Sequence, residues 1–138
     1  MDRVKVSIEA MVDAKIEKVW ECWNEPKHIT KWNFAIDTWC CPRASNDLRV
    51  GGRYSARMEA KDGSFGFDFE VTYDVVDKHK KISYTMGDGR QATTTFEQQN
   101  GGVWIATVFD AEQQNEVEMQ RNGWQSILNN FKKYVESI

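Results

Sequence analysis

Two arginines, Arg49 and Arg53, are well placed for binding chemistry because they flank the glycine pair Gly51-Gly52. A guanidinium can hold the acidic group of a ligand through two parallel hydrogen bonds. The same residues also fit a surface turn, in which the glycines supply the tight bend and the arginines are solvated or ion-paired. We keep both interpretations, and assign Arg53 to the candidate site as a cation at a pocket mouth.

Metal and redox chemistry find little support in the residue types. The two histidines, His28 and His79, lack metal-ligand spacing, and the three cysteines, Cys22, Cys40 and Cys41, form no framework. Adjacent cysteines seldom form a structural disulfide, so Cys40 and Cys41 are expected to be thiols in a reducing compartment. The sequence predicts no metal and no cofactor.

Catalytic residues are equally scarce. His28 could act as a base, but no nucleophile stands near it, and no serine elbow, metal motif or phosphate loop is present. Asp68, Glu70 and Asp74 share one face of a predicted strand, opposite an aromatic face, so we expect them to be solvated. We assign no catalytic residue, and an enzyme remains the less favoured alternative.

Aromatic side chains are the strongest candidates for a binding site. They make up 12% of the sequence, with six tryptophans in 138 residues. Such rings either fill a core or line an apolar cavity. The candidate ligand-binding residues are Trp32, Phe34, Trp39, Arg53, Tyr54, Met58, Phe67, Phe69, Tyr84, Met119, Gly123 and Trp124.

Charge and hydropathy limit the partners. The net charge is −3, and the basic residues are scattered, so nucleic acid is not an expected partner. No apolar run approaches the roughly 20 residues that cross a bilayer, and residues 1–5 lack the apolar stretch of a signal peptide. A cytoplasmic location is expected. The apolar segment 33–41 leaves a homodimer open.

The elements that position these residues begin with a strand over residues 4–12, where apolar and polar side chains alternate. Asp13 is predicted to cap a helix over about 16–23, and Pro26 to open a second short helix that ends near Trp32. Residues 33–48 show little periodicity and are predicted to be a loop folded over apolar surface.

Antiparallel strands are predicted next, at about 54–58, 65–75, 82–86, 92–96 and 103–109. In the second of these, Phe65 to Val75 alternate so that every apolar residue lies on one face. The end of the chain, from between Ala111 and Glu116, has the period of an amphipathic helix. Gly123 lies inside this helix, where it costs about 1 kcal/mol relative to alanine. Either close packing on the sheet or room for a ligand would explain it.

This order of elements predicts an α+β fold in a single domain over 1–138. A curved antiparallel sheet of about six to seven strands surrounds a long C-terminal helix, and two short helices follow the first strand. The helix must bury its apolar stripe, and the sheet offers the one large apolar face. A pocket remains where the two do not close completely.

Motifs in the same order occur in a known family. In chain order they are Val12-Asp13-Ala14, Lys18-Val19-Trp20, Pro26 with Trp32, Asp47-Leu48-Arg49 with Gly51-Gly52-Arg53, Gly63, Tyr73, Ile82, Tyr84, Thr85, and Gly123-Trp124 with Leu128. Over nearly its whole length the sequence resembles the homologue-like proteins of the activator of the ninety-kilodalton heat-shock protein ATPase, in the START-like (SRPBCC) superfamily. The resemblance implies a helix-grip fold of the START-like or Bet v-like kind.

Two departures from the family pattern, at Val71 and at Val103-Trp104, add bulk to the sheet.

Three functions stay open. The favoured one is binding of a small hydrophobic or amphipathic molecule between sheet and helix. The resemblance implies the second, an interaction module with a chaperone partner. The third is a hydrolase or cyclase that uses the same cavity.

Overall fold

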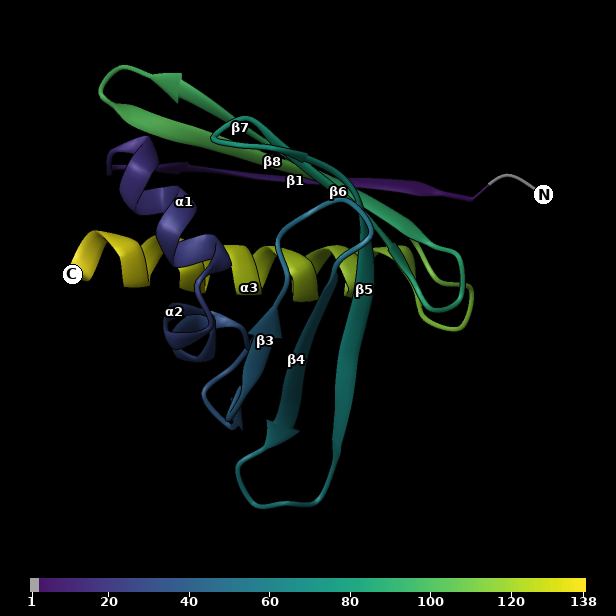
Figure 1. Ribbon diagram of the computed structural model, residues 1–138. Helices are drawn as coiled ribbons and strands as arrows, with labels where there is room; N and C mark the ends of the chain where they lie inside the picture. The colour runs from purple at the N-terminus through teal and green to yellow at the C-terminus, as the bar shows by residue number, and fades with distance from the viewer. Residues whose placement is uncertain (1–2) are drawn as a thin grey trace.

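The structure, a computed structural model, describes residues 3–138, so the first two residues of the N-terminal segment lie outside it. Its described part contains one antiparallel sheet of eight strands in the order β1-β8-β7-β6-β5-β4-β2, with β3 paired to β4 (Figure 1). The strands are β1 (Lys5–Val12), β2 (Trp39–Cys40), β3 (Ala44–Asn46), β4 (Arg53–Ala60), β5 (Gly66–Asp77), β6 (Lys81–Met86), β7 (Gln91–Gln99) and β8 (Gly102–Asp110).

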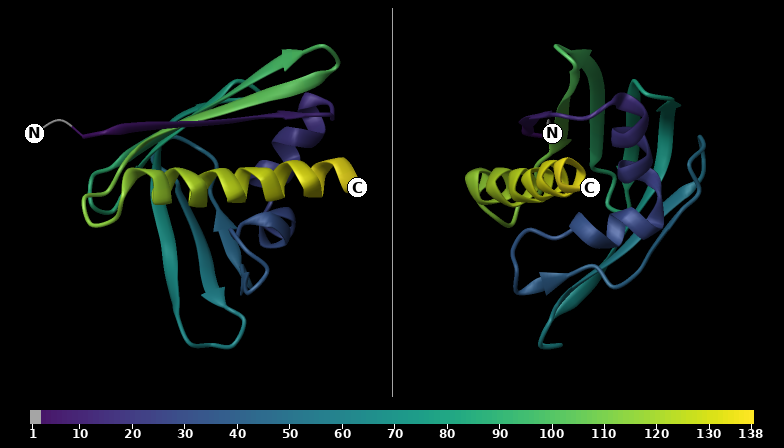
Figure 2. Two further views of the ribbon diagram at one scale, coloured as in Figure 1. Left: turned by 180° about the vertical axis from the view of Figure 1, so that it is seen from behind. Right: turned by 90° about the vertical axis from the view of Figure 1, so that its left-hand side faces the viewer.

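Three helices accompany the sheet: α1 (Ile16–Asn24), α2 (Pro26–Trp32) and α3 (Val117–Ser137). The sheet curls around α3, which lies along its concave side, and α1 and α2 close the end near the C-terminus (Figure 2). The predicted α+β helix-grip fold is therefore confirmed. Within residues 3–138, no helix is long and apolar enough to cross a membrane.

Two local predictions were wrong. The loop predicted over 33–48 contains two short strands, β2 and β3, which add to the edge of β4. Lys15, not Asp13, precedes the first turn of α1, and it makes no side-chain cap. The Asp13 backbone N–H instead donates to the Glu136 carboxylate, at 2.8 Å, and so ties the end of β1 to α3.

The core lies between the concave face of the sheet and α3. Phe131 of α3 is fully buried, and its ring centre lies 4.8 Å from Trp23 and 4.9 Å from Trp32. The indole N–H of Trp32 donates to the Cys22 carbonyl at 3.0 Å, which satisfies a buried donor. Aromatic packing therefore joins all three helices at one end of the molecule.

A β-bulge interrupts the long strand β5. The register with β6 shifts between Tyr73 and Val75, so Asp74 is an extra residue. The shift turns Val75 outward and lets Val76 pack against the core instead. The predicted apolar face is therefore wrong at Val75. It is also wrong at Phe65, which is 64% exposed just before β5 begins.

The glycine turn is a structural element. A Cβ on Gly52 would lie 2.1 Å from the Asp47 carbonyl oxygen, so no other residue fits there. Gly51 has a φ of +82°, and its N–H donates to the Tyr73 carbonyl at 2.9 Å. The turn thus aligns the start of β4 beside the bulge in β5.

Side chains of α3 cover the free edge of β1. The Gln125 amide both donates to the Glu9 carbonyl, at 3.0 Å, and accepts from the Glu9 N–H, at 3.3 Å. Further along α3, Lys132 donates to the Met11 carbonyl at 2.6 Å. These bonds satisfy backbone groups that an edge strand would otherwise leave open to pairing with another chain.

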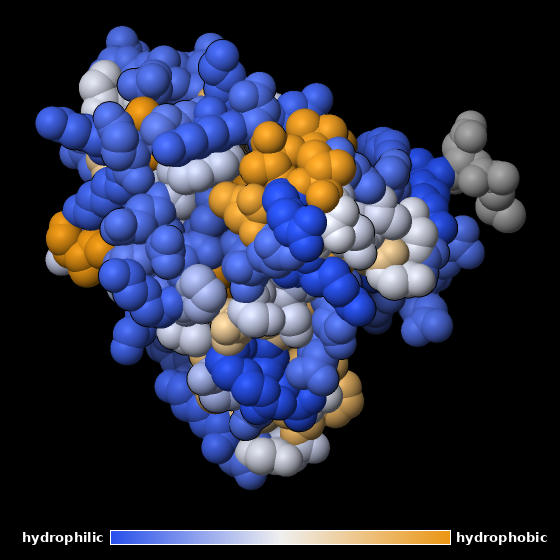
Figure 3. Space-filling model, viewed as in Figure 1, coloured by the Kyte–Doolittle hydropathy of each residue, from blue (hydrophilic) through white to orange (hydrophobic). Residues whose placement is uncertain are grey.

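The surface is largely hydrophilic on the face shown in Figure 3, where apolar side chains gather in the upper middle, over the paired strands β5 and β6, and near the C-terminal end of α3. Ten large apolar side chains of the described residues are exposed. They are Val4, Met11, Ile36, Val50, Phe65, Phe67, Val75, Val108, Met119 and Ile138.

Candidate ligand cavity

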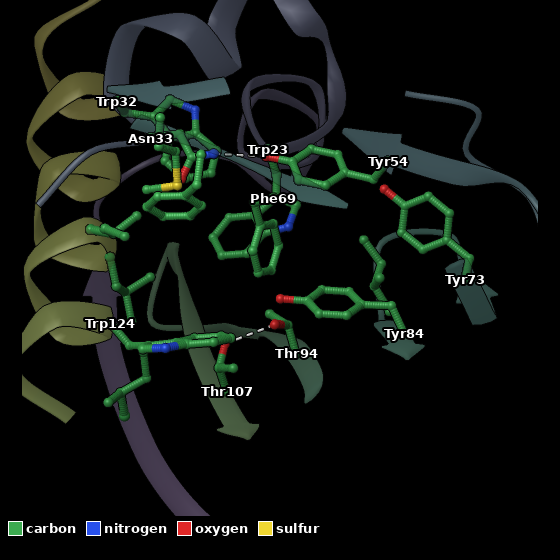
Figure 4. A pocket seen from close by; sticks show the side chains of 16 residues that line it. Trp23, Trp32, Asn33, Tyr54, Phe69, Tyr73, Tyr84, Thr94, Thr107 and Trp124 are labelled. Carbon is green, nitrogen blue, oxygen red and sulfur yellow. Dashed lines mark hydrogen bonds between the residues drawn. The ribbon is translucent and has the colours of Figure 1, made fainter. Parts of the chain in front are cut away.

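A cavity of about 200 Å³ lies between the concave face of the sheet and α3 (Figure 4). It is larger than the roughly 150 Å³ that admits benzene in a protein core, and smaller than typical drug-sized pockets of about 300 Å³ and more. Its lining residues are Ile8, Trp23, Trp32, Asn33, Tyr54, Met58, Phe67, Phe69, Tyr73, Ile82, Tyr84, Thr94, Thr107, Trp124, Ile127 and Leu128.

The structure brings seven of the twelve predicted site residues together in this lining. They are Trp32, Tyr54, Met58, Phe67, Phe69, Tyr84 and Trp124. The side chains come from α2, β4, β5, β6 and α3, so residues far apart in the sequence face one space. Phe67 is 42% exposed, which marks the β4–β5 hairpin as the place where the cavity approaches the surface.

Arg53 does not belong to the cavity. Its guanidinium lies on the outer face of the sheet and forms an ion pair with Glu70 at 2.8 Å. Arg49 is likewise exposed and pairs with Asp47 at 2.9 Å. The reason is the strand period: Tyr54 points inward, so its neighbour Arg53 points outward. The surface-turn interpretation of the glycine motif therefore holds, and the placement of Arg53 at a pocket mouth was wrong.

The other four predicted residues also lie outside the lining. Met119, in the first turn of α3, is 56% exposed. Trp39 packs beside Phe65, with ring centres 5.9 Å apart, on the hairpin tip. Phe34 packs against the core without lining the cavity.

Gly123 borders open space. A Cβ built on it meets no heavy atom of another described residue within 4 Å, beyond its own helix backbone and chain neighbours. Close packing of α3 on the sheet therefore does not explain this glycine, and it is not among the cavity residues.

Phe69 sits centrally among the aromatic side chains of the cavity (Figure 4). Its ring meets Tyr54 at 6.2 Å, Tyr84 at 6.0 Å and Trp124 at 6.4 Å between centres, each with the planes nearly perpendicular. Edge-to-face contacts of this kind are favourable for aromatic pairs. Trp124 in turn stacks flat on Phe109 at 4.0 Å, which fixes one wall of the cavity.

Most polar groups of the lining are already hydrogen-bonded to the protein. The Asn33 amide donates to the Tyr54 hydroxyl at 2.9 Å, and the Tyr73 hydroxyl donates to the Asn46 side chain at 2.6 Å. Thr94 and Thr107 face each other across β7 and β8, with their hydroxyl oxygens 2.7 Å apart. These bonds leave the lining largely apolar in character.

The Tyr84 hydroxyl differs from these groups. Figure 4 shows it pointing into the cavity, and within residues 3–138 it has no hydrogen-bond partner. Burial raises the pKa of Tyr84 above its ordinary value, and burial does the same for Tyr73 and, together with the neighbouring Tyr84, for Tyr54. All three phenols therefore keep their protons at neutral pH.

Sequence reasoning missed several lining residues, and some left a usable signal. Thr94 lies two residues from Ala92 and from Phe96, and Thr107 lies two residues from Ile105 and from Phe109. Strand period alone therefore places both threonines on the inner face with these apolar side chains. No local pattern indicates Asn33. It follows the last residue of α2, and only the folding of the chain brings it to the cavity.

His28 and the cysteines lie elsewhere. The His28 ring nitrogen Nδ1 is 2.7 Å from the Tyr134 hydroxyl, and neither residue lines the cavity. Burial raises the pKa of the Cys41 thiol to about 11 and also raises that of Cys22, which makes both poor nucleophiles. In the described part of the chain, no three His, Cys, Asp or Glu residues are gathered so as to hold a metal ion.

The curled sheet, the central helix and the cavity between them define a helix-grip protein of the START-like class. Residues 13–136 match the family described as "Activator of Hsp90 ATPase homolog 1-like protein", and the chain belongs to this family. The resemblance inferred from the ordered motifs is thereby confirmed. No curated protein matches the sequence.

Solved structures support the same assignment. An AHSA1-like protein from Aeromonas hydrophila is 45% identical, with a TM-score of 0.91, over 97% of this chain and 93% of that one. A protein from Cytophaga hutchinsonii is 47% identical, with a TM-score of 0.83, over 96% and 92%. A protein from Nitrosomonas europaea has a TM-score of 0.84 over 97% and 95%, but at 16% identity it shows the shared fold alone.

Proposed function

We propose that this protein binds a small hydrophobic or amphipathic molecule between its sheet and α3. The observation that carries the proposal is the cavity of about 200 Å³, walled by aromatic side chains from six elements. A concave, mostly apolar site with a few oriented polar groups is the usual form of a small-molecule site. The position of the cavity between sheet and helix supports this proposal.

The volume and lining define the size of the ligand. An apolar cavity somewhat larger than one that holds benzene suits one or two fused rings, or a short branched chain. Bound there, the molecule would exchange water contact for contact with Phe69, Trp124 and their neighbours. Each square ångström of apolar surface removed from water contributes about 25 cal/mol.

Naphthalene is a suitable probe, because three tryptophans, Trp23, Trp32 and Trp124, line the cavity. We expect saturable binding of one molecule per chain, followed through the indole N–H signals in two-dimensional NMR spectra. Only the cavity tryptophans should shift strongly. Spectra without saturable shifts would refute the proposal.

A pair of variants on α3 locates the binding. Ile127→Trp places bulk in the cavity and should abolish naphthalene binding, because Ile127 lines it. Met119→Trp makes a similar change on the same helix at an exposed position, and should leave binding intact. Equal effects of the two substitutions would show that naphthalene binds elsewhere.

A second candidate is an interaction module, to which the family description points by naming an activator of a chaperone ATPase. The specific observation in its favour is the exposed aromatic tip of the β4–β5 hairpin, where Trp39 packs against Phe65 and Phe67. The test is a pull-down with the bacterial ninety-kilodalton chaperone, repeated with Phe65→Ser. Recovery of no complex with the native chain would count against this function.

A further inference from the structure

We infer that the cavity selects an uncharged ligand carrying a carbonyl or similar oxygen, which accepts a hydrogen bond from the Tyr84 hydroxyl, and that it rejects carboxylates of the same shape. This inference rests on the proposed binding function and assigns Tyr84 as the residue that sets specificity. It follows from two independent features of the cavity, the absence of charge and a hydroxyl group with no hydrogen-bond partner among the described residues.

The first feature is the charge of the lining. Among the sixteen described residues that form it, none is Asp, Glu, Lys, Arg or His. The arginines and acids nearest in sequence, such as Arg53 and Glu70, pair with each other on the opposite face of the sheet. A ligand carboxylate would therefore lose its hydration without meeting a cation, which is strongly unfavourable.

The second feature is the state of each polar group in the lining. The Tyr73 proton is donated to Asn46, and the two threonine hydroxyls are bonded to each other. The Tyr54 hydroxyl accepts a hydrogen bond from the Asn33 amide. Tyr84 alone among these hydroxyls has no bond to a described residue, and Figure 4 shows it directed into the space beside Trp124 and the threonine pair.

The position of Tyr84 makes it a selective donor. Phe69 contacts Tyr84 on one side and Tyr54 on another, so each hydroxyl is set among aromatic rings. A ligand oxygen that reaches Tyr84 replaces no protein hydrogen bond. A pure hydrocarbon would leave this donor unpaired in a dry site, which costs free energy on binding.

Three probes of nearly equal shape separate these effects. They are 2-acetylnaphthalene, its hydrocarbon isostere 2-isopropenylnaphthalene, and the anion 2-naphthoate at pH 7.5. We expect 2-acetylnaphthalene to bind about tenfold more tightly than the hydrocarbon, the value of one good neutral hydrogen bond. We expect 2-naphthoate to bind at least about a hundredfold more weakly than 2-acetylnaphthalene.

Three conservative variants assign the selectivity. Tyr84→Phe should make the ketone and the hydrocarbon bind equally, with the hydrocarbon bound at least as tightly as by the native chain, because no donor is left unpaired. Tyr54→Phe tests the other phenol, which accepts from Asn33 and donates to no described residue, and the inference expects the preference to stay in place. Tyr134→Phe, which changes a tyrosine on α3 outside the cavity, is the matched control and should change nothing.

The outcomes distinguish the inference from the proposed function. If none of the three probes binds, binding in the cavity itself is refuted. If the hydrocarbon or the carboxylate binds as tightly as the ketone, the cavity binds ligands and the inference about selectivity is wrong. If Tyr54→Phe removes the preference and Tyr84→Phe does not, the assignment to Tyr84 is overturned.

Discussion

Replacing Gly123 by alanine is expected to stabilise the protein. Gly123 lies seven residues into α3, and a Cβ built there meets no other side chain or sheet atom within 4 Å. Its φ is not among the positive values, so alanine fits the backbone without strain. Gly123 therefore lowers the stability of the helix, and no close contact at this position compensates for the loss.

The size of the effect follows from helix propensity. A glycine in a helix interior is about 0.8–1 kcal/mol less favourable than alanine. For a chain of 138 residues, this corresponds to a rise in melting temperature of about 3–4 °C. Urea unfolding and calorimetry measure both quantities. The affinity for naphthalene should stay unchanged, because Gly123 does not line the cavity.

Gly52→Ala is the matched comparison. There a Cβ would lie 2.1 Å from the Asp47 carbonyl oxygen, so the same substitution should destabilise the protein by about 1–3 kcal/mol. A fall in the melting temperature of Gly123→Ala would refute the reasoning, because it would mean that α3 packs closely at that glycine. Weaker naphthalene binding without lost stability would instead assign Gly123 to the ligand site.

Three further predictions concern stability. Thr94→Val and Thr107→Val should each cost about 1 kcal/mol by leaving one buried hydroxyl unpaired, whereas the double variant should be nearly neutral in urea unfolding. Asp110→Asn should destabilise the protein at pH 7. Burial alone would raise the pKa of Asp110, but hydrogen bonds from Lys5 and a backbone N–H outweigh it and lower this pKa, so the loss should shrink as pH falls below about 4. Hydrogen exchange should be faster in the first two turns of α3 than in its second half, which contains all of its buried residues. Uniform exchange along α3 would contradict this.

Much of the fold could be predicted because period and turn chemistry agree along most of the chain. The alternation in β1 and the glycine turn before β4 each fix a boundary within a residue or two. The bulge at Asp74 could not be predicted, because one inserted residue reverses the two faces and leaves the composition of the strand unchanged. The wrong assignment of Val75 follows directly from it.

The cavity was predicted less completely than the fold. Strand period indicates some of its residues, whereas others depend on how distant elements pack. Tyr54, Met58 and Phe69 carry a strand period, so sequence places them on the inner face. The same strand period places Arg53 on the outer face, where it pairs with Glu70. The alternation should therefore have outweighed the expectation of a cation at the pocket mouth. Asn33 depends on how α2 meets β4, which no local pattern records.

The distribution of contacts along α3 explains where the cavity lies. Its buried side chains, Leu128, Phe131 and Val135, are all in the second half of the helix. The bonds to β1 and the residue after it run from Gln125, near the middle of α3, to Glu136, near its end. In the first half, Trp124 stacks on Phe109 and borders the cavity. A helix fastened at one end can close the core there and still leave room for a ligand beside the other. Leu128 is both a buried core residue and part of the lining, so the cavity begins where the well-packed half of α3 ends.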